Sequence, residues 1–247
     1  MNTKKVFLTT IALMGLCAST AFAQETGIEI KGITWATRNV AAPGTFAANP
    51  ENPGMFYQWN RKKAWSATGE YVTGWDSSKP TGETWAPEND PCPAGWRVPT
   101  NEELESLMST IKYWVSSSPQ GCYFGSGDNI ENMLFLPAAG MRYYNNGELV
   151  WRGTYGYYWS TEAYDSSDAY YMSLSSSKPE IHPVDRKYGH CVRCVKDDSR
   201  TSVQSTPADQ ATVLGYYSTM GQRLAQEPTS GIYIIIYDNG KAEKVVK

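Results

Sequence analysis

The chain has 247 residues, of which 41% are hydrophobic and 19% are charged, and its formal net charge is −3. It has no block of basic residues, so the composition argues against nucleic acid or an anionic membrane surface as a partner. The chain contains 9 Trp, 17 Tyr and 21 Gly, and only one segment has helical periodicity. This combination indicates a protein rich in strands and loops.

The first residues have the pattern of a secretory signal peptide. Two lysines precede an apolar run that is too short to span a bilayer, and Ala21-Phe-Ala23 is a small-residue cleavage site. We therefore expect cleavage after Ala23, removal of residues 1–23, and a secreted or surface-exposed chain with no membrane insertion. Lipidation at Cys17 is the alternative, and the bulky Leu16 before it disfavours that reading.

A long irregular segment follows the first predicted strands. Residues 27–40 alternate between apolar and polar side chains, which predicts one or two strands. Residues 41–91 are rich in Pro, Gly, Asn and Trp and predict only a short strand at 55–59. Such a segment is often functional. Its aromatic side chains either contact a sugar or a protein partner or fold inward as the core of the loop. The candidate ligand-binding residues are Trp65, Tyr71, Trp75 and Trp85.

One helix is predicted, over residues 100–113. Thr100 and Glu103 have the spacing of a capping box, in which each side chain bonds the backbone amide of the other residue. Apolar residues then follow at positions i, i+3, i+4 and i+7, which places them on one core-facing stripe. These residues are Leu104, Leu107, Met108 and Ile111.

Short strands separated by turn signals follow the helix. Asn146-Gly147 predicts a two-residue hairpin turn. Strands, one helix and then further strands give an α+β fold that is mainly antiparallel. The loops around 123–130 and 161–168 are further candidates for ligand contact. The predicted strands cover residues 133–136, 141–144, 148–152, 157–161, 169–174 and 190–195.

Four cysteines remain once the signal peptide is removed. An even number in an exported chain suggests two disulfides, for which three connectivities exist. Cys191 and Cys194 are three residues apart on a predicted strand, so their side chains leave opposite faces and pair poorly with each other. The other two cysteines are Cys92 and Cys122.

Four segments together resemble the Fibrobacter succinogenes major paralogous domain, a C-type-lectin-like module of secreted and surface proteins. They are Cys92-Pro-Ala-Gly-Trp-Arg-Val-Pro-Thr100, Phe135–Arg142, Tyr157–Thr161 and Cys191–Val195. The resemblance implies that residues 24–198 form a C-type-lectin-like domain. It also implies a disulfide between Cys92 and Cys194, and with it a second between Cys122 and Cys191.

The same resemblance implies structural roles for distinctive residues within these segments. Arg97 lies in an otherwise apolar stretch, and in lectin-like modules the matching segment is structural, so we expect a buried pairing rather than an anion ligand. Trp96, Trp151 and Trp159 stand in motif and strand positions that predict core packing.

The C-terminal part is predicted to be a separate small module. Residues 199–211 are rich in Ser, Thr, Pro and Gln and predict a linker. Residues 212–247 contain predicted strands at 212–217 and 231–237 and resemble the C-terminal sorting domain of type IX secretion substrates. That resemblance implies a secretion machinery as partner and a source among the Bacteroidetes. The alternative is an accessory hairpin docked on the preceding domain.

Catalytic motifs are nearly absent. The two histidines lack metal-ligand spacing, and no Gly-x-Ser-x-Gly, P-loop or dinucleotide fingerprint occurs. We expect no cofactor, and a non-enzymatic binding protein whose ligand is a glycan or a cell-surface protein. One alternative is a structural or fimbrial-type accessory subunit. A second is a formylglycine-generating-type thiol oxidase, since residues 95–103 resemble a segment of those enzymes and Cys191 and Cys194 form a late cysteine pair.

Overall fold

The computed structural model describes residues 25–125, 129–198, 213–218, 222–237 and 242–246. The predicted signal peptide with its cleavage site and the predicted linker at 199–211 lie outside the described residues. None of the helices in the described ranges combines the length and the apolar character that crossing a membrane requires.

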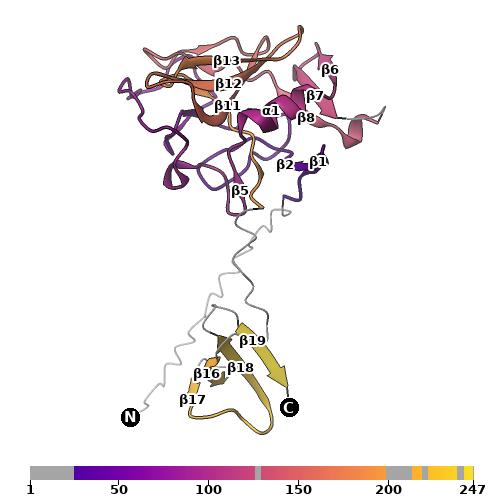
Figure 1. Ribbon diagram of the computed structural model, residues 1–247, viewed down its shortest axis with the longest axis vertical. Helices are drawn as coiled ribbons and strands as arrows, with labels where there is room; N and C mark the ends of the chain where they lie inside the picture. Colours follow the sequence, from indigo (N-terminus) through magenta and orange to yellow (C-terminus); the bar gives the residue numbers. More distant parts are fainter. Residues whose placement is uncertain (1–24, 126–128, 199–212, 219–221, 238–241, 247) are drawn as a thin grey trace, which may run out of the picture.

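The described chain is mostly β-structure with one α-helix, which confirms the α+β prediction (Figure 1). The helix α1 spans Asn101–Met108, and two 3-10 turns span Pro87–Asn89 and Ile130–Asn132. The strands are β1 (Ile28–Ile30), β2 (Ile33–Trp35), β3 (Phe56–Gln58), β4 (Ala64–Trp65), β5 (Trp96–Arg97), β6 (Ile111–Val115), β7 (Gly121–Gly125), β8 (Leu134–Pro137), β9 (Met141–Arg142), β10 (Leu149–Val150), β11 (Gly156–Ala163), β12 (Asp168–Leu174), β13 (Glu180–Asp185), β14 (Gly189–His190), β15 (Val195–Lys196), β16 (Val213–Ser218), β17 (Arg223–Leu224), β18 (Ile232–Tyr237) and β19 (Ala242–Val246).

Residues 25–198 form four small antiparallel sheets. Their strand orders are β1-β2-β15-β5, β10-β9-β14-β3-β4, β11-β12-β13 and β6-β7-β8. Strand β15 pairs with both β2 and β5, and β14 pairs with both β3 and β9. The last two strands of this region therefore pair with strands near its start: β14 pairs with β3 and β15 pairs with β2, although more than a hundred residues separate the partners in sequence.

The capping box at the start of α1 is confirmed. The Glu103 amide donates to Thr100 Oγ1 at 3.2 Å, and the Thr100 amide donates to Glu103 Oε2 at 2.8 Å. Leu104 and Leu107 are buried, and α1 packs against the β11–β13 sheet (Figure 1).

The predicted end of the helix, at residue 113, is wrong. The helix stops at Met108, where the amides of Ser109 and Thr110 bond back to the carbonyls of Glu105 and Leu107. Ile111 instead begins β6, and its side chain is exposed. The run Ile-Lys-Tyr-Trp-Val is rich in β-branched and aromatic residues, and pairing with β7 outweighs the helical spacing of Ile111.

The hairpin predicted at Asn146-Gly147 joins β9 and β10, but its loop is longer than two residues. The amide of Tyr143 donates to the carbonyl of Glu148 at 2.8 Å, which leaves four residues in the loop. Gly147 has a φ of 69°, and a Cβ at this position would come within 2.8 Å of the Trp75 ring. Glycine is therefore required here by both conformation and space.

Strand β11 separates two hydrophobic core clusters. Tyr158 lies in the first cluster, with Trp35, Phe56 and Met172, and Trp159 lies in the second. Neighbouring residues of one strand face opposite sides of a sheet, so one strand supplies both clusters.

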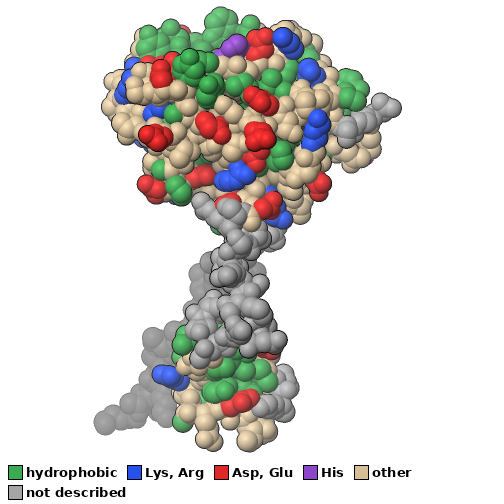
Figure 2. All heavy atoms as spheres, viewed as in Figure 1, with side chains coloured by type: hydrophobic (Ala, Val, Ile, Leu, Met, Phe, Trp, Pro, Cys, Tyr) green, Lys and Arg blue, Asp and Glu red, His purple; other side chains and the backbone are tan. Residues whose placement is uncertain are grey.

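At the surface, the face drawn in Figure 2 carries interspersed acidic and basic side chains.

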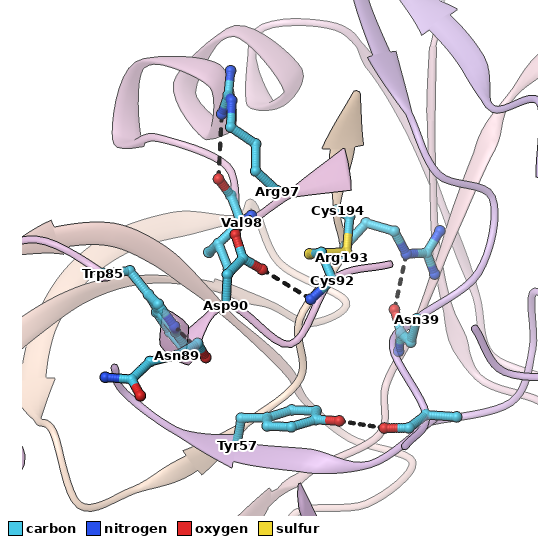
Figure 3. The surroundings of a disulfide bond; sticks show 11 residues. Asn39, Tyr57, Trp85, Asn89, Asp90, Cys92, Arg97, Val98, Arg193 and Cys194 are labelled. Carbon is cyan, nitrogen blue, oxygen red and sulfur yellow. Dashed lines mark hydrogen bonds between the residues drawn. A yellow bond between two sulfur atoms is a disulfide. The ribbon is translucent and has the colours of Figure 1, made fainter. Parts of the chain in front are cut away.

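The disulfide between Cys92 and Cys194 is confirmed, with a sequence separation of 102 (Figure 3). The predicted second disulfide is wrong, because Cys122 and Cys191 are free thiols. Both side chains are buried in the first core cluster. Their sulfur atoms lie 3.6 Å from the Tyr123 carbonyl oxygen and 3.5 Å from that of Pro53, respectively. Each is packed as a small apolar side chain, which is how buried free cysteines commonly behave.

This correction predicts the behaviour of the thiols in solution. Burial raises the pKa of Cys122 to about 11 and that of Cys191 to about 12, so both remain protonated and shielded at pH 8. In protein lacking residues 1–23 we expect no reaction with a thiol-specific disulfide reagent in the native state. Denaturation without reductant is expected to release two equivalents of thiol. A titre of zero in denaturant would contradict this and would show that Cys122 and Cys191 form a disulfide.

Strands β16–β19 form a sheet of their own in the order β17-β16-β18-β19 (Figure 1). The strands predicted at 212–217 and 231–237 are confirmed as β16 and β18. Tyr233 is the buried residue of β18, and its hydroxyl donates to the carboxylate of Glu227 at 2.6 Å. Strand β19 pairs with β18 on one side and forms one edge of the sheet.

Candidate functional site

The four aromatic residues predicted to contact a ligand do not form one exposed patch. Trp65 and Trp85 are buried, Trp75 is half-buried, and only Tyr71 is exposed, at 57%. The Trp65 and Trp75 rings pack with their centroids 4.7 Å apart, and Trp85 packs edge-to-face against Trp59 at 6.0 Å. The prediction of a ligand-contacting surface is therefore wrong for Trp65 and Trp85, because the long segment uses these rings as its own core.

The segment around Cys92 is a structural junction (Figure 3). The Asp90 carboxylate accepts from the amides of Cys92 and Val98, at 2.8 and 3.2 Å. Arg97 is half-buried, and its guanidinium makes a two-bond ion pair with the Glu103 carboxylate at 2.8 and 2.6 Å. These contacts tie the disulfide to the start of α1, and they engage the side chains of Asp90, Arg97 and Glu103 within the protein. Trp96 and Trp159 are buried in the second core cluster, as predicted. The core prediction is wrong for Trp151, which is exposed.

Three arginines are fully buried, and the sequence analysis predicted none of them: Arg142, Arg186 and Arg193. Their guanidinium groups bond mainly to backbone carbonyl oxygens. Arg193, in Figure 3, donates to the Asn39 side chain at 2.9 Å and to the Ala36 carbonyl at 3.1 Å. Burial lowers the pKa of Arg193 to about 10, so it stays charged at neutral pH. An arginine between apolar or aromatic residues, as in Met141-Arg142-Tyr143 and Val192-Arg193-Cys194, is the signal that could have found two of the three.

Arg186 joins two loops that are far apart in sequence. It donates to the carbonyl oxygens of Asp165 and Asp168, the latter at 3.2 Å, and to that of Gly82 at 2.8 Å. Its guanidinium carbon lies 4.3 Å from the centroid of the Trp59 ring, a cation–π contact. The segment 80–83 and the loop 164–167 are thus held against each other by one side chain.

The loop between β11 and β12 is itself tightly closed. The Asp165 carboxylate accepts from the amides of Ser167 and Asp168, at 2.6 and 2.8 Å, and the Tyr164 amide donates to the Asp168 carbonyl at 3.0 Å. The two backbone hydrogen bonds lower the pKa of Asp165, so this carboxylate is ionised at neutral pH.

Between these two loops lies a surface depression of about 520 Å³, here called the Arg186 depression. Tyr164 stands in its lining with 56% of its surface exposed, and the exposed Glu83 and Asp165 line it as well. Its remaining lining residues include Thr81, Gly82 and Arg186. It combines one flat apolar ring with carboxylate acceptors on a fixed frame. It also lies where the predicted contact loop 161–168 meets the 41–91 segment.

A row of aromatic rings crosses the β11–β13 sheet on the side away from the first core cluster. Trp159, Tyr171 and His182 are directly paired across the three strands. His190 is fully buried against this row, with its ring stacked on Trp159 at a centroid distance of 4.2 Å. Burial lowers the pKa of His190 well below its usual value, so the imidazole is neutral and packs as an aromatic ring.

The structure assembles no catalytic constellation around the predicted cysteine pair. Cys194 is bonded to Cys92, and Cys191 is buried with a raised pKa. Within the described ranges, no three or more His, Cys, Asp or Glu side chains gather closely enough to hold a metal ion. Asp128, in the predicted loop 123–130, lies outside the described residues.

A family model described as a domain of unknown function (DUF8237) matches residues 109–195, about a third of the chain. The match starts just after α1 and ends in β15, so it includes the loop 164–167 and Arg186 but not the segment 80–83. No curated protein and no solved structure matches this chain.

Proposed function

We propose that this protein is a secreted or surface-exposed, non-enzymatic binding protein whose ligand is a glycan. The observation that carries this proposal is the exposed Tyr164 ring beside Glu83 and Asp165 in the Arg186 depression. An aromatic ring covers the apolar face of a sugar, and carboxylates accept hydrogen bonds from its hydroxyl groups. The fixed frame reduces the entropy lost on binding.

The proposal includes a C-type-lectin-like fold for residues 24–198. It is supported by the disulfide between Cys92 and Cys194 and by the pairing of β15 with β2 and β5. Export through the signal peptide 1–23 and sorting through residues 212–247 complete the proposal and rest on the sequence patterns alone.

The alternative of a formylglycine-generating-type oxidase has less support. That chemistry requires a reactive cysteine pair, whereas Cys194 is held in a disulfide and Cys191 is buried and protonated. A structural subunit is favoured by one observation, the edge position of β19 among the strands that the structure describes, since an edge strand can accept a strand from another chain. A protein that is monomeric on sizing at high concentration removes this second candidate.

The glycan proposal is tested with Tyr164→Ala. Folded, labelled protein is applied to a glycan array, and the glycans bound are titrated by calorimetry. Removing the ring is expected to weaken binding about tenfold, which corresponds to about 1.4 kcal/mol. Tyr71→Ala is the matched control, because Tyr71 is equally exposed and lies outside the depression.

Two outcomes contradict the proposal in different ways. An array with no bound glycan removes the glycan as ligand. A loss of affinity in Tyr71→Ala with none in Tyr164→Ala moves the site to the surroundings of Tyr71, one of the four candidate residues predicted in the 41–91 segment.

A further inference from the structure

A second depression, of about 400 Å³, shares the lining residue Thr81 with the Arg186 depression. The turn between β3 and β4 forms one wall, and residues 76–81 form the opposite wall. Four basic side chains and one acidic side chain line it, in a chain whose net charge is −3. They are Arg61, Lys62, Lys63, Lys79 and Asp76, and we call this the basic depression.

Most of its positive charge is uncompensated. Arg61 is paired with Asp76 and also donates to the Ser78 hydroxyl at 2.7 Å. The three lysines form no ion pair with a carboxylate in the part of the chain that the structure describes. Lys63 instead lies 4.0 Å from the centroid of the Trp65 ring, and Lys79 donates to the Ser167 hydroxyl. The depression is therefore lined by more positive than negative charge, and Lys79 also interacts electrostatically with the carboxylates of Asp165 and Asp168.

The frame of the basic depression is fixed by Asn60. This buried residue has a φ of 52°, and its side chain donates to the Thr81 carbonyl at 2.7 Å and accepts from the Ala86 amide at 2.7 Å. A Cβ at Gly82 would lie 2.8 Å from the same Asn60 amide nitrogen, so the two walls touch. The basic side chains therefore extend from a rigid base.

The basic depression adjoins the Arg186 depression. Thr81 lines both of them, and the hydrogen bond from Lys79 to Ser167 reaches the loop that carries Tyr164. A ligand seated on Tyr164 therefore has a cluster of positive charge beside it.

We propose that the basic depression binds the anionic substituent of a saccharide held in the Arg186 depression, so that the protein selects acidic glycans; this rests on the proposed function. Lysine ammonium groups act as point charges and do not impose the two-bond geometry of arginine. A carboxylate and a sulfate share the required chemistry, and the choice between them is left to the probes.

The experiment compares an oligogalacturonate, its methyl ester and a sulfated galactan oligosaccharide by calorimetry on the full mature chain. The acidic probe that fits is expected to bind about tenfold more tightly than the neutral ester at low salt, and this preference is expected to shrink at 0.5 M salt. Lys62→Gln with Lys79→Gln is expected to remove the preference. Lys178→Gln with Lys196→Gln makes the same change in net charge at exposed sites outside the depression and is expected to keep it.

The outcomes separate this inference from the proposed function. If the protein binds the acidic probe and the methyl ester with equal affinity, and the double variant Lys62→Gln with Lys79→Gln does not change either affinity, the selection of acidic glycans is overturned. The proposal that the protein binds glycans is then unaffected. If no saccharide binds, amide chemical shifts are followed while sulfate replaces chloride at constant ionic strength. Shifts confined to residues 60–63 and 76–81 then support an anion site in the basic depression, and their absence overturns it.

Discussion

Replacing Cys92 and Cys194 together with alanine is expected to lower the free energy of unfolding by about 4 to 5 kcal/mol. The disulfide closes a loop with a sequence separation of 102, and in the chain-entropy model such a long loop is restricted most in the unfolded state. It also joins the segment before α1 to β15, which pairs with both β2 and β5. A loss of this size is a large fraction of the stability of an ordinary domain.

Denaturant unfolding monitored by tryptophan fluorescence measures this loss. Cys122→Ala is the matched control, because it makes the same substitution in the core without removing a cross-link, and we expect about 1 kcal/mol for it. If the double variant loses no more than this control, the disulfide is not a main source of stability.

Arg142→Met is expected to lower the free energy of unfolding by about 3 to 5 kcal/mol. The guanidinium of Arg142 donates to four carbonyl oxygens: Ser66 (2.7 and 3.0 Å), Thr68 (2.8 Å), Glu70 (2.9 Å) and Gly147 (3.0 Å). Removing it leaves buried acceptors unpaired, each at a cost of about 1 to 3 kcal/mol. Arg142→Lys is expected to rescue little, since an ammonium cannot reproduce the planar fork.

The control for this prediction is Arg152→Met. Arg152 is exposed and makes a single 3.3 Å bond to the Ala67 carbonyl, so we expect a change below about 0.5 kcal/mol. Thermal and denaturant unfolding of the three variants provide the comparison. Equal losses for Arg142→Met and Arg152→Met would contradict the role assigned to the buried guanidinium.

Features that depend on local spacing could be predicted from the sequence. The Thr100–Glu103 capping box needs only two residues three apart. The place of the hairpin follows from Gly147, but its four-residue length was not predicted. The disulfide between Cys92 and Cys194 came from resemblance to a family pattern that includes both positions. The end of α1 was missed because Ile111 fits a helical stripe and a strand equally well, and pairing with β7 decides between them.

Features that depend on distant contacts could not be predicted. Which way Trp65 and Trp85 point depends on Trp75 and Trp59, and nothing in the local composition reveals these partners. The free thiols of Cys122 and Cys191 show that an even cysteine count does not ensure complete pairing.

The candidate site shows the same division between local pattern and distant contact. The loop 161–168 and the 41–91 segment were both expected to contact ligand. That residues 80–83 of this segment meet the loop through Arg186 was not predicted, because backbone carbonyls carry that contact. Backbone acceptors leave no trace in a sequence, so a buried arginine that binds them cannot be matched to a partner in advance.

We propose that the loops of the Arg186 depression recognise the ligand, while the Cys92 segment holds the scaffold. Hydrogen–deuterium exchange of the protein with and without the glycan that binds best tests this most directly. We expect slower exchange in peptides covering 79–83 and 163–168, and unchanged exchange in those covering 92–104. Protection confined to 92–104, or to residues 66–76, would contradict it.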